Sequence, residues 1–437
     1  NSNTCHEREL LKLIVRNDIS RNEEETKFDI PGDQLSRVHE TISPASCARS
    51  ILLPPTVIKS FFIRQRTASV VVKRPPSEPT MREMMNSDAQ FHNEILFYRR
   101  YAVGHDDLPQ CIYADEKPPS ESVLVLHNIG QQGFKLSQWK YRAPLEYTMA
   151  AIREIARFHT KGYVMKERNS DEFFDFVRTI QETRFDTNPE NLLKMVINTA
   201  MNRAVDYLRD HGHRGEFYDK LRSKFEHGYE TVALEIVKPE EPLATLCHGD
   251  FTLNNTFFKR EDDQLKVMLI DFALVRYGSP IIDLSTFLSL HCAEELDKDM
   301  IDNALKVYHD SLKQCLAEND IEDCERFSYE ALHEDYKRKG IFGYIIASFF
   351  LAMLMGKCET TTEEMVALGI EEQAKLIYEV GGDEISEILG NIAHQVRSML
   401  LRWKLEKSVL QFRLVYNEEL LFPQSRQHVA LFLVTIN

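Results

Sequence analysis

One short stretch of the sequence limits the possible folds more than any other. His248-Gly249-Asp250 is followed by Asn255, five residues after the aspartate, and Asp271-Phe272 begins twenty-one residues after Asp250. The residues between them read as a strand, a loop and a hairpin, with the charged turn Glu261-Asp262-Asp263 in the middle. A loop and a hairpin of this length can bring three oxygen-bearing side chains to one point.

These residue types suit phosphoryl transfer. One carboxylate must accept or orient the proton of an acceptor hydroxyl, and a carboxamide with a second carboxylate must hold Mg²⁺ against nucleotide phosphates. Asp250 is therefore the candidate catalytic base, and Asn255 and Asp271 are the candidate metal ligands. The spacing matches the catalytic loop and metal motif of protein kinases. Gly249, between His and Asp, favours kinases of small molecules and can relieve crowding in a tight loop.

A phosphate anchor is predicted upstream. Lys73 ends the valine-rich run 69–72, and Glu94 follows twenty-one residues later in a helical pattern. In kinases a strand lysine oriented by a helix glutamate holds the α- and β-phosphates. Each residue alone is more often simply solvated, so this prediction depends on the downstream motif.

Asp283, in the run Gly278-Ser279-Pro280-Ile281-Ile282-Asp283-Leu284, has two structural roles open. It can be the N-cap of a helix that begins near Leu284, or it can brace the catalytic loop from below. A structural role is favoured over direct catalysis. His159 is interpreted as a satisfied helix residue.

The order of patterns along the chain predicts an α+β fold of two lobes. Strand-like runs at 57–64, 68–73 and 123–126, with a helical pattern over 80–101, predict a small mixed lobe. Helical spacing dominates from 285 to 403 and predicts a larger helical lobe. The predicted organisation is an N-terminal extension with the start of the N-lobe at 1–50, a nucleotide-binding N-lobe at 51–128, a helical C-lobe with the catalytic loop at 129–408, and a C-terminal tail at 409–437.

Composition narrows the range of partners. The net charge of −15 disfavours non-specific binding to nucleic acid or to an anionic membrane. The longest apolar stretch, 341–355, is shorter than the ~20 residues of a spanning helix and predicts a buried core helix. Eight scattered cysteines without a CxxC pair suit reduced cytosolic thiols. Cys247-His248 and His291-Cys292 are isolated pairs, so we expect no zinc site. The cysteine usage predicts a cytoplasmic location, and we expect no obligate protein partner.

The motifs resemble those of the ecdysteroid-kinase-like branch of the choline-kinase and aminoglycoside-phosphotransferase superfamily. The segments that carry this resemblance are Leu246-Cys247-His248-Gly249-Asp250 with Asn254-Asn255, Leu269-Ile270-Asp271-Phe272, Arg276-Tyr277-Gly278-Ser279-Pro280 with Asp283-Leu284, Phe91-His92-Asn93-Glu94, and Gly133-Phe134-Lys135. The resemblance spans residues 60–400 and implies a bilobal protein-kinase-like fold. It also implies ATP and Mg²⁺ as cofactors, with transfer of the γ-phosphate to a hydroxyl of a small molecule such as an ecdysteroid or a xenobiotic. Backbone groups near Leu126 and Asn128 would bind adenine.

Two departures from the family pattern concern the nucleotide site. The stretch 43–55 contains no glycine, whereas the family normally has a glycine-containing loop there, and His127-Asn128 replaces an acidic residue followed by Asn or Asp. These departures motivate an alternative, a pseudokinase that binds a small molecule or a protein. The complete set of Lys73, Asp250, Asn255 and Asp271 argues against it.

Two further alternatives share the fold. A protein kinase is disfavoured, because Gly249 replaces the usual arginine and Asp271-Phe272-Ala273 lacks the final glycine. A choline or aminoglycoside kinase would differ only in its cationic acceptor, which calls for an acidic or aromatic pocket that the sequence does not locate.

Overall fold

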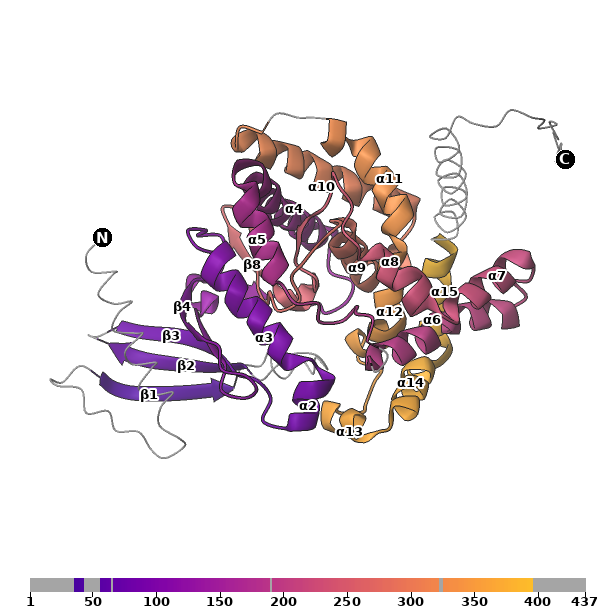
Figure 1. Cartoon of the computed structure of the whole chain (residues 1–437), viewed down its shortest axis with the longest axis horizontal. Helices are drawn as coiled ribbons and strands as arrows, with labels where there is room; N and C mark the ends of the chain where they lie inside the picture. Colours follow the sequence, from indigo (N-terminus) through magenta and orange to yellow (C-terminus); the bar gives the residue numbers. More distant parts are fainter. Residues whose placement is uncertain (1–34, 43–55, 64–65, 189–190, 322–324, 396–437) are drawn as a thin grey trace, which may run out of the picture.

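The protein has two lobes, a small one built on a sheet and a larger helical one. The computed structural model describes residues 35–42, 56–63, 66–188, 191–321 and 325–395. The sheet lies at one end of the molecule and the helices make up the rest (Figure 1). This arrangement confirms the predicted α+β, protein-kinase-like fold. The glycine-free stretch 43–55 and the tail 409–437 lie outside the described residues.

The N-lobe sheet has five antiparallel strands in the order β1-β2-β3-β5-β4. They are β1 (Leu35–Ile42), β2 (Thr56–Ile63), β3 (Arg66–Lys73), β4 (Cys111–Asp115) and β5 (Val123–His127). β5 lies between β3 and β4, and its first four residues are all buried, as expected of a strand covered on both faces. The sequence predicted β2, β3 and β5, but not β1 or β4.

The helical pattern predicted over 80–101 is three elements rather than one. α2 (Pro79–Met84) ends before Asn86, whose left-handed φ of 50° breaks the helix, and α3 (Ser87–Leu96) starts directly after it. Asn tolerates this conformation better than most side chains. A π-helical turn, η2 (Phe97–Tyr101), then follows and buries three aromatic rings. α3 carries Glu94 on its buried side.

The C-lobe begins with α4 (Leu145–Arg168), which contains the helix expected near His159. The other helices are α5 (Ser170–Thr179), α6 (Leu192–Asp210), α7 (Glu216–Phe225), α8 (Leu234–Ile236), α9 (Ile281–His291), α10 (Lys298–Glu318), α11 (Tyr329–Lys339), α12 (Ile341–Leu354), α13 (Thr362–Ala367), α14 (Ile370–Glu379) and α15 (Gly382–Gln395). α12 is the predicted core helix and packs closely on α9, where Gly343 meets the carbonyl oxygen of Ser285. Among the described residues, no helix combines the length and apolar character that crossing a membrane requires.

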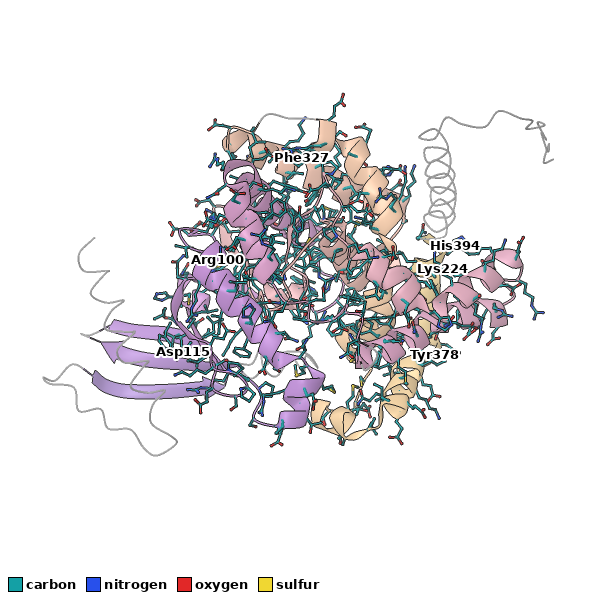
Figure 2. The ribbon with its side chains drawn as sticks, viewed as in Figure 1. Arg100, Asp115, Lys224, Phe327, Tyr378 and His394 are labelled. Atoms are coloured by element: carbon teal, nitrogen blue, oxygen red, sulfur yellow. The ribbon has the colours of Figure 1, made fainter. Side chains whose placement is uncertain are left out.

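Side chains fill the space between these helices. Tyr378 and Lys224 lie on the opposite side of the molecule from Asp115 of β4 (Figure 2). Buried residues from both lobes belong to one large apolar cluster, in which Phe97 of the N-lobe and Phe272 of the C-lobe are both fully buried. The two lobes therefore share a core next to the segment that carries the motif.

The motif itself lies on and between small strands that are separate from the N-lobe sheet. β7 (Thr245–Cys247) pairs with β10 (Arg276–Gly278), and β8 (Thr256–Glu261) forms a hairpin with β9 (Gln264–Leu269). The hairpin turns at Asp262 and Asp263, both with left-handed φ, as predicted from the charged turn. β6 (Lys135–Leu136) completes the β8–β9 sheet. The loop 248–255 leads into β8 and Asp271 follows β9, so both lie at the open end of the hairpin, where Thr256 pairs with Leu269.

Candidate active site

Lys73, Glu94 and Asp271 meet between the lobes. The ammonium of Lys73, at the end of β3, donates to both oxygens of Glu94 at 2.7 and 2.9 Å and lies 3.2 Å from Asp271 Oδ1. All three side chains are buried. Burial opposes the charge of Lys73, but the two carboxylates outweigh it and the pKa of the ammonium is raised. Burial raises the pKa of Glu94, against the influence of Lys73.

Asp271 is held by the aromatic residue that follows it. The ring of Phe272 stacks on Phe97 with the centroids 3.9 Å apart, and it also packs on Phe158. Asp271 itself has a left-handed φ of 67°, which a non-glycine residue adopts only when its surroundings impose it. The π-helical turn after α3 therefore contacts the segment that carries Asp271, so the positions of Glu94 and Asp271 are linked.

Asp250 and Asn255 face each other across the catalytic loop. The amide of Asn255 donates to Oδ2 of Asp250 and to its carbonyl oxygen, both at 2.9 Å. His248 Nε2 donates to the carbonyl of Ile270 at 2.9 Å, which links the loop to the residue before Asp271. Burial raises the pKa of Asp250, and the nearby charge of Asp271 adds to this shift. The structure thus brings together the five residues that the sequence assigned to catalysis, metal and phosphate.

Asp283 braces the start of the loop from below. Its Oδ2 accepts the backbone N–H of His248 at 2.7 Å and its Oδ1 accepts that of Gly249 at 2.9 Å. His159 Nε2 donates to the same carboxylate at 2.9 Å, and Tyr308 contacts the other ring nitrogen at 2.8 Å. α9 begins at Ile281 without a side-chain cap, so the N-cap role is wrong and the bracing role is the observed one. His159 is satisfied, as expected.

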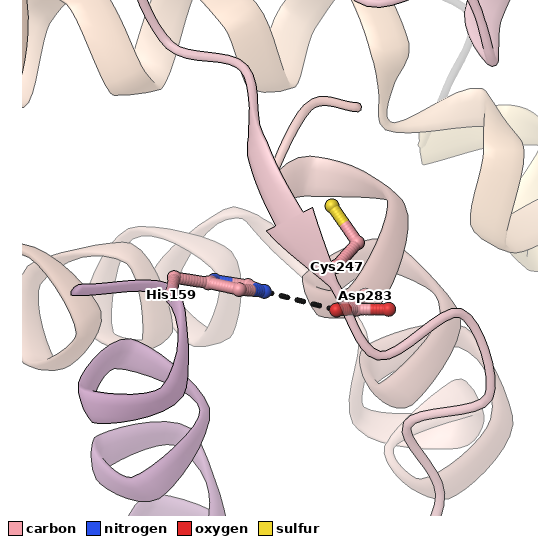
Figure 3. Close-up of side chains that lie close together, drawn as sticks. All are labelled: His159, Cys247 and Asp283. Atoms are coloured by element: carbon pink, nitrogen blue, oxygen red, sulfur yellow. Dashed lines mark hydrogen bonds and ion pairs between the residues drawn. The ribbon is translucent and has the colours of Figure 1, made fainter. Parts of the chain in front are cut away.

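His159, Cys247 and Asp283 form a compact buried cluster whose polar atoms lie within 4.8 Å of one another (Figure 3). Such a cluster can suggest a metal site, but each group has protein partners. The Cys247 thiol contacts the carbonyls of Gly278 and Ser279, and burial raises its pKa well above the usual value. A neutral thiol beside a fully hydrogen-bonded carboxylate is a structural element, not a prepared metal ligand set.

His291 braces the other end of the loop, and sequence reasoning did not find it. Its Nε2 accepts the backbone N–H of Leu253 at 3.0 Å, and its Nδ1 donates to the carbonyl of Lys140 at 3.1 Å. Burial lowers the pKa of His291 to about 3, so the ring stays neutral and keeps this pattern. α9 therefore holds both ends of the catalytic loop, with Asp283 in its first turn and His291 in its last.

Gly249 is required by the shape of the loop. Its φ is +80°, and a Cβ at this position would lie 1.8 Å from the carbonyl oxygen of Leu274. Both the left-handed backbone and the close approach exclude a side chain here. The crowding that the sequence suggested is therefore present.

The residues fit a magnesium ion. Asn255 Oδ1 is buried and has no hydrogen-bond partner within the described part of the chain, although the amide nitrogen of the same side chain has two. A buried acceptor without a partner is costly unless a ligand occupies it. Carboxylate and amide oxygens are the ligands that Mg²⁺ takes, and Asp271 supplies the carboxylate.

The segment predicted to bind adenine consists of the end of β5 and the start of a short 3₁₀ turn, η3 (Ile129–Gln132). Leu126 is buried and pairs with Val71 of β3. Asn128 donates to Ser69 Oγ and accepts from the N–H of Gly130, both at 2.9 Å, so its side chain shapes the turn. Adenine binding by backbone groups near these residues stays a prediction.

A basic residue that the sequence did not indicate lies beside Asp250. Arg184 Nη1 is 3.8 Å from Asp250 Oδ1. It belongs to the connection between α5 and α6, a polar stretch without periodicity. No spacing rule links Arg184 to Asp250, which lies 66 residues further along the chain, so only the folded chain shows the contact.

Comparison with known families decides the relationship that the motifs suggested. Residues 63–320 match the model of the ecdysteroid kinase-like family, which is more than half of the chain. The chain belongs to this family. The match covers Lys73, Glu94, the catalytic loop and Asp271, and it confirms the resemblance drawn from the motifs.

Solved structures similar to this ecdysteroid kinase-like protein are distant. A Plasmodium vivax ethanolamine kinase is 11% identical over 83% of this chain and 84% of that chain, with a TM-score of 0.43. A microcompartment-associated aminopropanol kinase is 10% identical over 77% and 88%, with a TM-score of 0.36. A spectinomycin phosphotransferase in complex with ADP and spectinomycin is 10% identical over 76% and 88%, with a TM-score of 0.35. No curated protein matches the sequence.

Proposed function

We propose that this protein transfers the γ-phosphoryl group of ATP to a hydroxyl of a small molecule. The observation that carries the proposal is the convergence of Lys73, Glu94 and Asp271 beside a loop in which Asp250 and Asn255 face each other. Membership of a kinase-like family supports it. Each residue type has a part in phosphoryl transfer that matches its position.

The phosphate end of the site would be built on Lys73. The ammonium of Lys73 donates two hydrogen bonds to Glu94, and these fix the direction of the Lys73 side chain. The ammonium would then contact the α- and β-phosphates. Asn255 and Asp271 would hold Mg²⁺, which when bound neutralises phosphate charge. Asn255 Oδ1, the buried acceptor described above, is the atom available for this role.

The acceptor end would be built on Asp250. Its carboxylate accepts the proton of the acceptor hydroxyl as the oxygen–phosphorus bond forms and the bond between γ-phosphorus and the bridging oxygen of ADP breaks. Burial raises the pKa of Asp250, which makes the carboxylate a stronger base than one in water. The Asn255 amide keeps one carboxylate oxygen directed, so the other is free to approach the hydroxyl.

The acceptor is proposed from the family. An ecdysteroid or another apolar hydroxylated compound, such as a xenobiotic, is the first class to examine, because the matching family is described as ecdysteroid kinase-like. We place the reaction in the cytoplasm as part of the same proposal, since ATP is abundant there.

The direct test is a phosphoryl-transfer assay. Purified protein with Mg-ATP is screened against hydroxylated steroids and other alcohols with radiolabelled ATP. Asp250→Ala is expected to lower the rate at least ~10²-fold, the usual contribution of a positioned base. Asp299→Ala, at an exposed carboxylate in α10, is the matched control. Normal activity in the Asp250 variant would overturn the assignment.

The pseudokinase alternative is separated by nucleotide binding. A ligand that binds only the folded state raises the unfolding temperature by mass action. The proposed function predicts such a shift with millimolar Mg-ATP, and no shift would favour the pseudokinase. The stretch 43–55, which motivated that alternative, is outside the described residues.

A further inference from the structure

The connection between α5 and α6 supplies a cation that the catalytic loop lacks. The residues from His248 to Phe258 include no lysine or arginine. Lys73 is already engaged by Glu94 and Asp271. Arg184 reaches the site from outside the motif, and its guanidinium lies 3.8 Å from the Asp250 carboxylate.

The backbone around Arg184 is fixed from within its own segment. One oxygen of Glu182 accepts the backbone N–H groups of Thr183, Arg184 and Phe185 at 3.0, 2.9 and 2.9 Å. Arg276, on β10, donates to the same oxygen at 2.5 Å. A turn closed by four hydrogen bonds to one carboxylate oxygen directs the Arg184 side chain without help from a ligand.

The same connection is tied to both lobes. Asn93, the residue before Glu94 on α3, forms a pair of hydrogen bonds with the backbone of Gln181 at 2.8 and 2.9 Å. On the C-lobe side, the carbonyl of Arg184 accepts from Asn191 and Tyr229, both at 3.0 Å. The connection therefore spans the helix that orients Lys73 and the lobe that carries the catalytic loop.

The guanidinium itself keeps its donors available. At 3.8 Å the contact with Asp250 is an ion pair but is too long for a hydrogen bond. The Arg184 side chain donates no hydrogen bond to any residue of the described ranges, although arginine carries five N–H groups. Only 11% of the side chain is exposed. Arg276 differs, because it is bound to Glu182 and lies over the ring of Phe185.

Two proposed catalytic carboxylates act on the charge of Arg184. Burial lowers the pKa of the guanidinium, and the negative charges of Asp250 and Asp271 both oppose this shift. Asp250 is the proposed base, so a cation 3.8 Å from its carboxylate is near the phosphoryl group in transit. In phosphoryl transfer the charge is spread over the equatorial oxygens of that group.

We propose that Arg184 binds the terminal phosphate of ATP and holds it during transfer, through the free N–H groups of its guanidinium. This inference rests on the proposed function, because it requires ATP in the site. A guanidinium suits three oxygens on one phosphorus better than an ammonium does, since its donors lie in a fixed plane. It gives the site a phosphate ligand from a segment outside its sequence motif.

Nucleotide binding without any acceptor tests the inference. Isothermal titration calorimetry measures the affinity of Mg-AMP-PNP and of Mg-ADP for the full chain and its variants. Arg184→Gln is expected to weaken AMP-PNP about tenfold or more, because a charge-assisted hydrogen bond is lost, and to leave ADP unchanged. Arg184→Lys should retain part of the preference. Arg178→Gln, at an exposed arginine at the end of α5, is the matched control and should change neither affinity.

The outcomes separate this inference from the proposed function. If the unaltered protein binds neither nucleotide, the proposed function fails. If it binds both and Arg184→Gln weakens them equally or not at all, only the role of Arg184 is overturned. Retained ADP binding shows that the variant is folded. If Arg184→Gln fails to bind ADP, Arg184→Lys decides. The inference requires that Arg184→Lys binds AMP-PNP more weakly than the unaltered protein does and binds ADP equally well.

Discussion

The two faces of the catalytic loop differ in how their polar groups are satisfied. On the inner face, against α9, Asp283 accepts two backbone N–H groups and His291 accepts a third. On the outer face, Asn255 Oδ1 and the Arg184 guanidinium keep hydrogen-bonding capacity that the described residues do not use. A buried polar group with every partner supplied by the protein supports the fold, whereas one left open is suited to a ligand.

The two aspartates of this region show the same contrast in their pKa shifts. Burial alone would raise the pKa of both carboxyls. In Asp283 the hydrogen bond and charge of His159, with the backbone N–H of Gly249, reverse this and lower the pKa. In Asp250 the Arg184 charge, which makes no hydrogen bond to the carboxylate, and the Asn255 amide do not outweigh burial, so the pKa is raised. Asp283 is thus kept ionised as a brace, while Asp250 is prepared to take a proton.

The largest effect is expected for the inner carboxylate. Asp283→Ala leaves His159 and the N–H groups of His248 and Gly249 without their acceptor inside the core. Breaking a buried charged network in this way costs about 3–5 kcal/mol. Urea denaturation should show this loss, and Asp299→Ala should show almost none. A loss of unfolding free energy below about 1 kcal/mol would mean that Asp283 does not support the fold, and the contrast between the two faces would fail at this residue.

Gly249→Ala is expected to come next, at about 3 kcal/mol, because it combines a left-handed backbone with a steric overlap. The added Cβ would lie 1.8 Å from the Leu274 carbonyl oxygen. Gly212→Ala separates the two causes, since Gly212 also has a positive φ of 91° but no heavy atom within 4 Å of its Cβ position. Thermal or urea unfolding should show a smaller loss for Gly212→Ala, and equal losses would contradict the steric explanation.

The sequence predicted the proposed catalytic and metal-binding residues better than the residues that hold the catalytic loop in place. Asp250, Asn255 and Asp271 were found because phosphoryl transfer requires these groups in a short span. Lys73 and Glu94 were found because a lysine that ends a strand is followed, at a suitable distance, by a glutamate in a helical pattern. The sequence identified Asp283 but left two structural roles for it, an N-cap and a brace of the catalytic loop. His291 and Arg184 were not found, because their partners are a backbone N–H group and a carboxylate brought close only by packing. β4 was missed because it is short and mostly half-buried, so it shows no clear alternation.

His291 gives the inner face a measurable pH dependence. The folded protein holds its pKa at about 3, whereas an unfolded histidine titrates near 6.5. Between these values the unfolded chain binds one more proton, so the stabilisation is complete above pH 6.5 and is lost as the pH falls. From pH 7.5 to pH 5 this group should cost about 2 kcal/mol of unfolding free energy.

Urea denaturation at several pH values compares the unaltered protein with His291→Gln, which has no titrating ring. The variant should lose about 2 kcal/mol less than the unaltered protein over this pH range. Parallel pH curves for the two proteins would mean that the ring is not kept neutral and does not act as a fixed acceptor for Leu253.

The smallest effect on stability is expected on the outer face. Asn255→Ala removes two hydrogen bonds to Asp250, but it also removes the buried Oδ1 that lacks a partner. These contributions oppose each other, so the unfolding free energy should change by less than about 1 kcal/mol. The part of the ATP-induced rise in unfolding temperature that depends on Mg²⁺ should be lost, and the part seen with ATP in EDTA should remain. A large loss of stability with an intact Mg²⁺ effect would show that Asn255 supports the fold, and the distinction between the two faces would then fail at this residue.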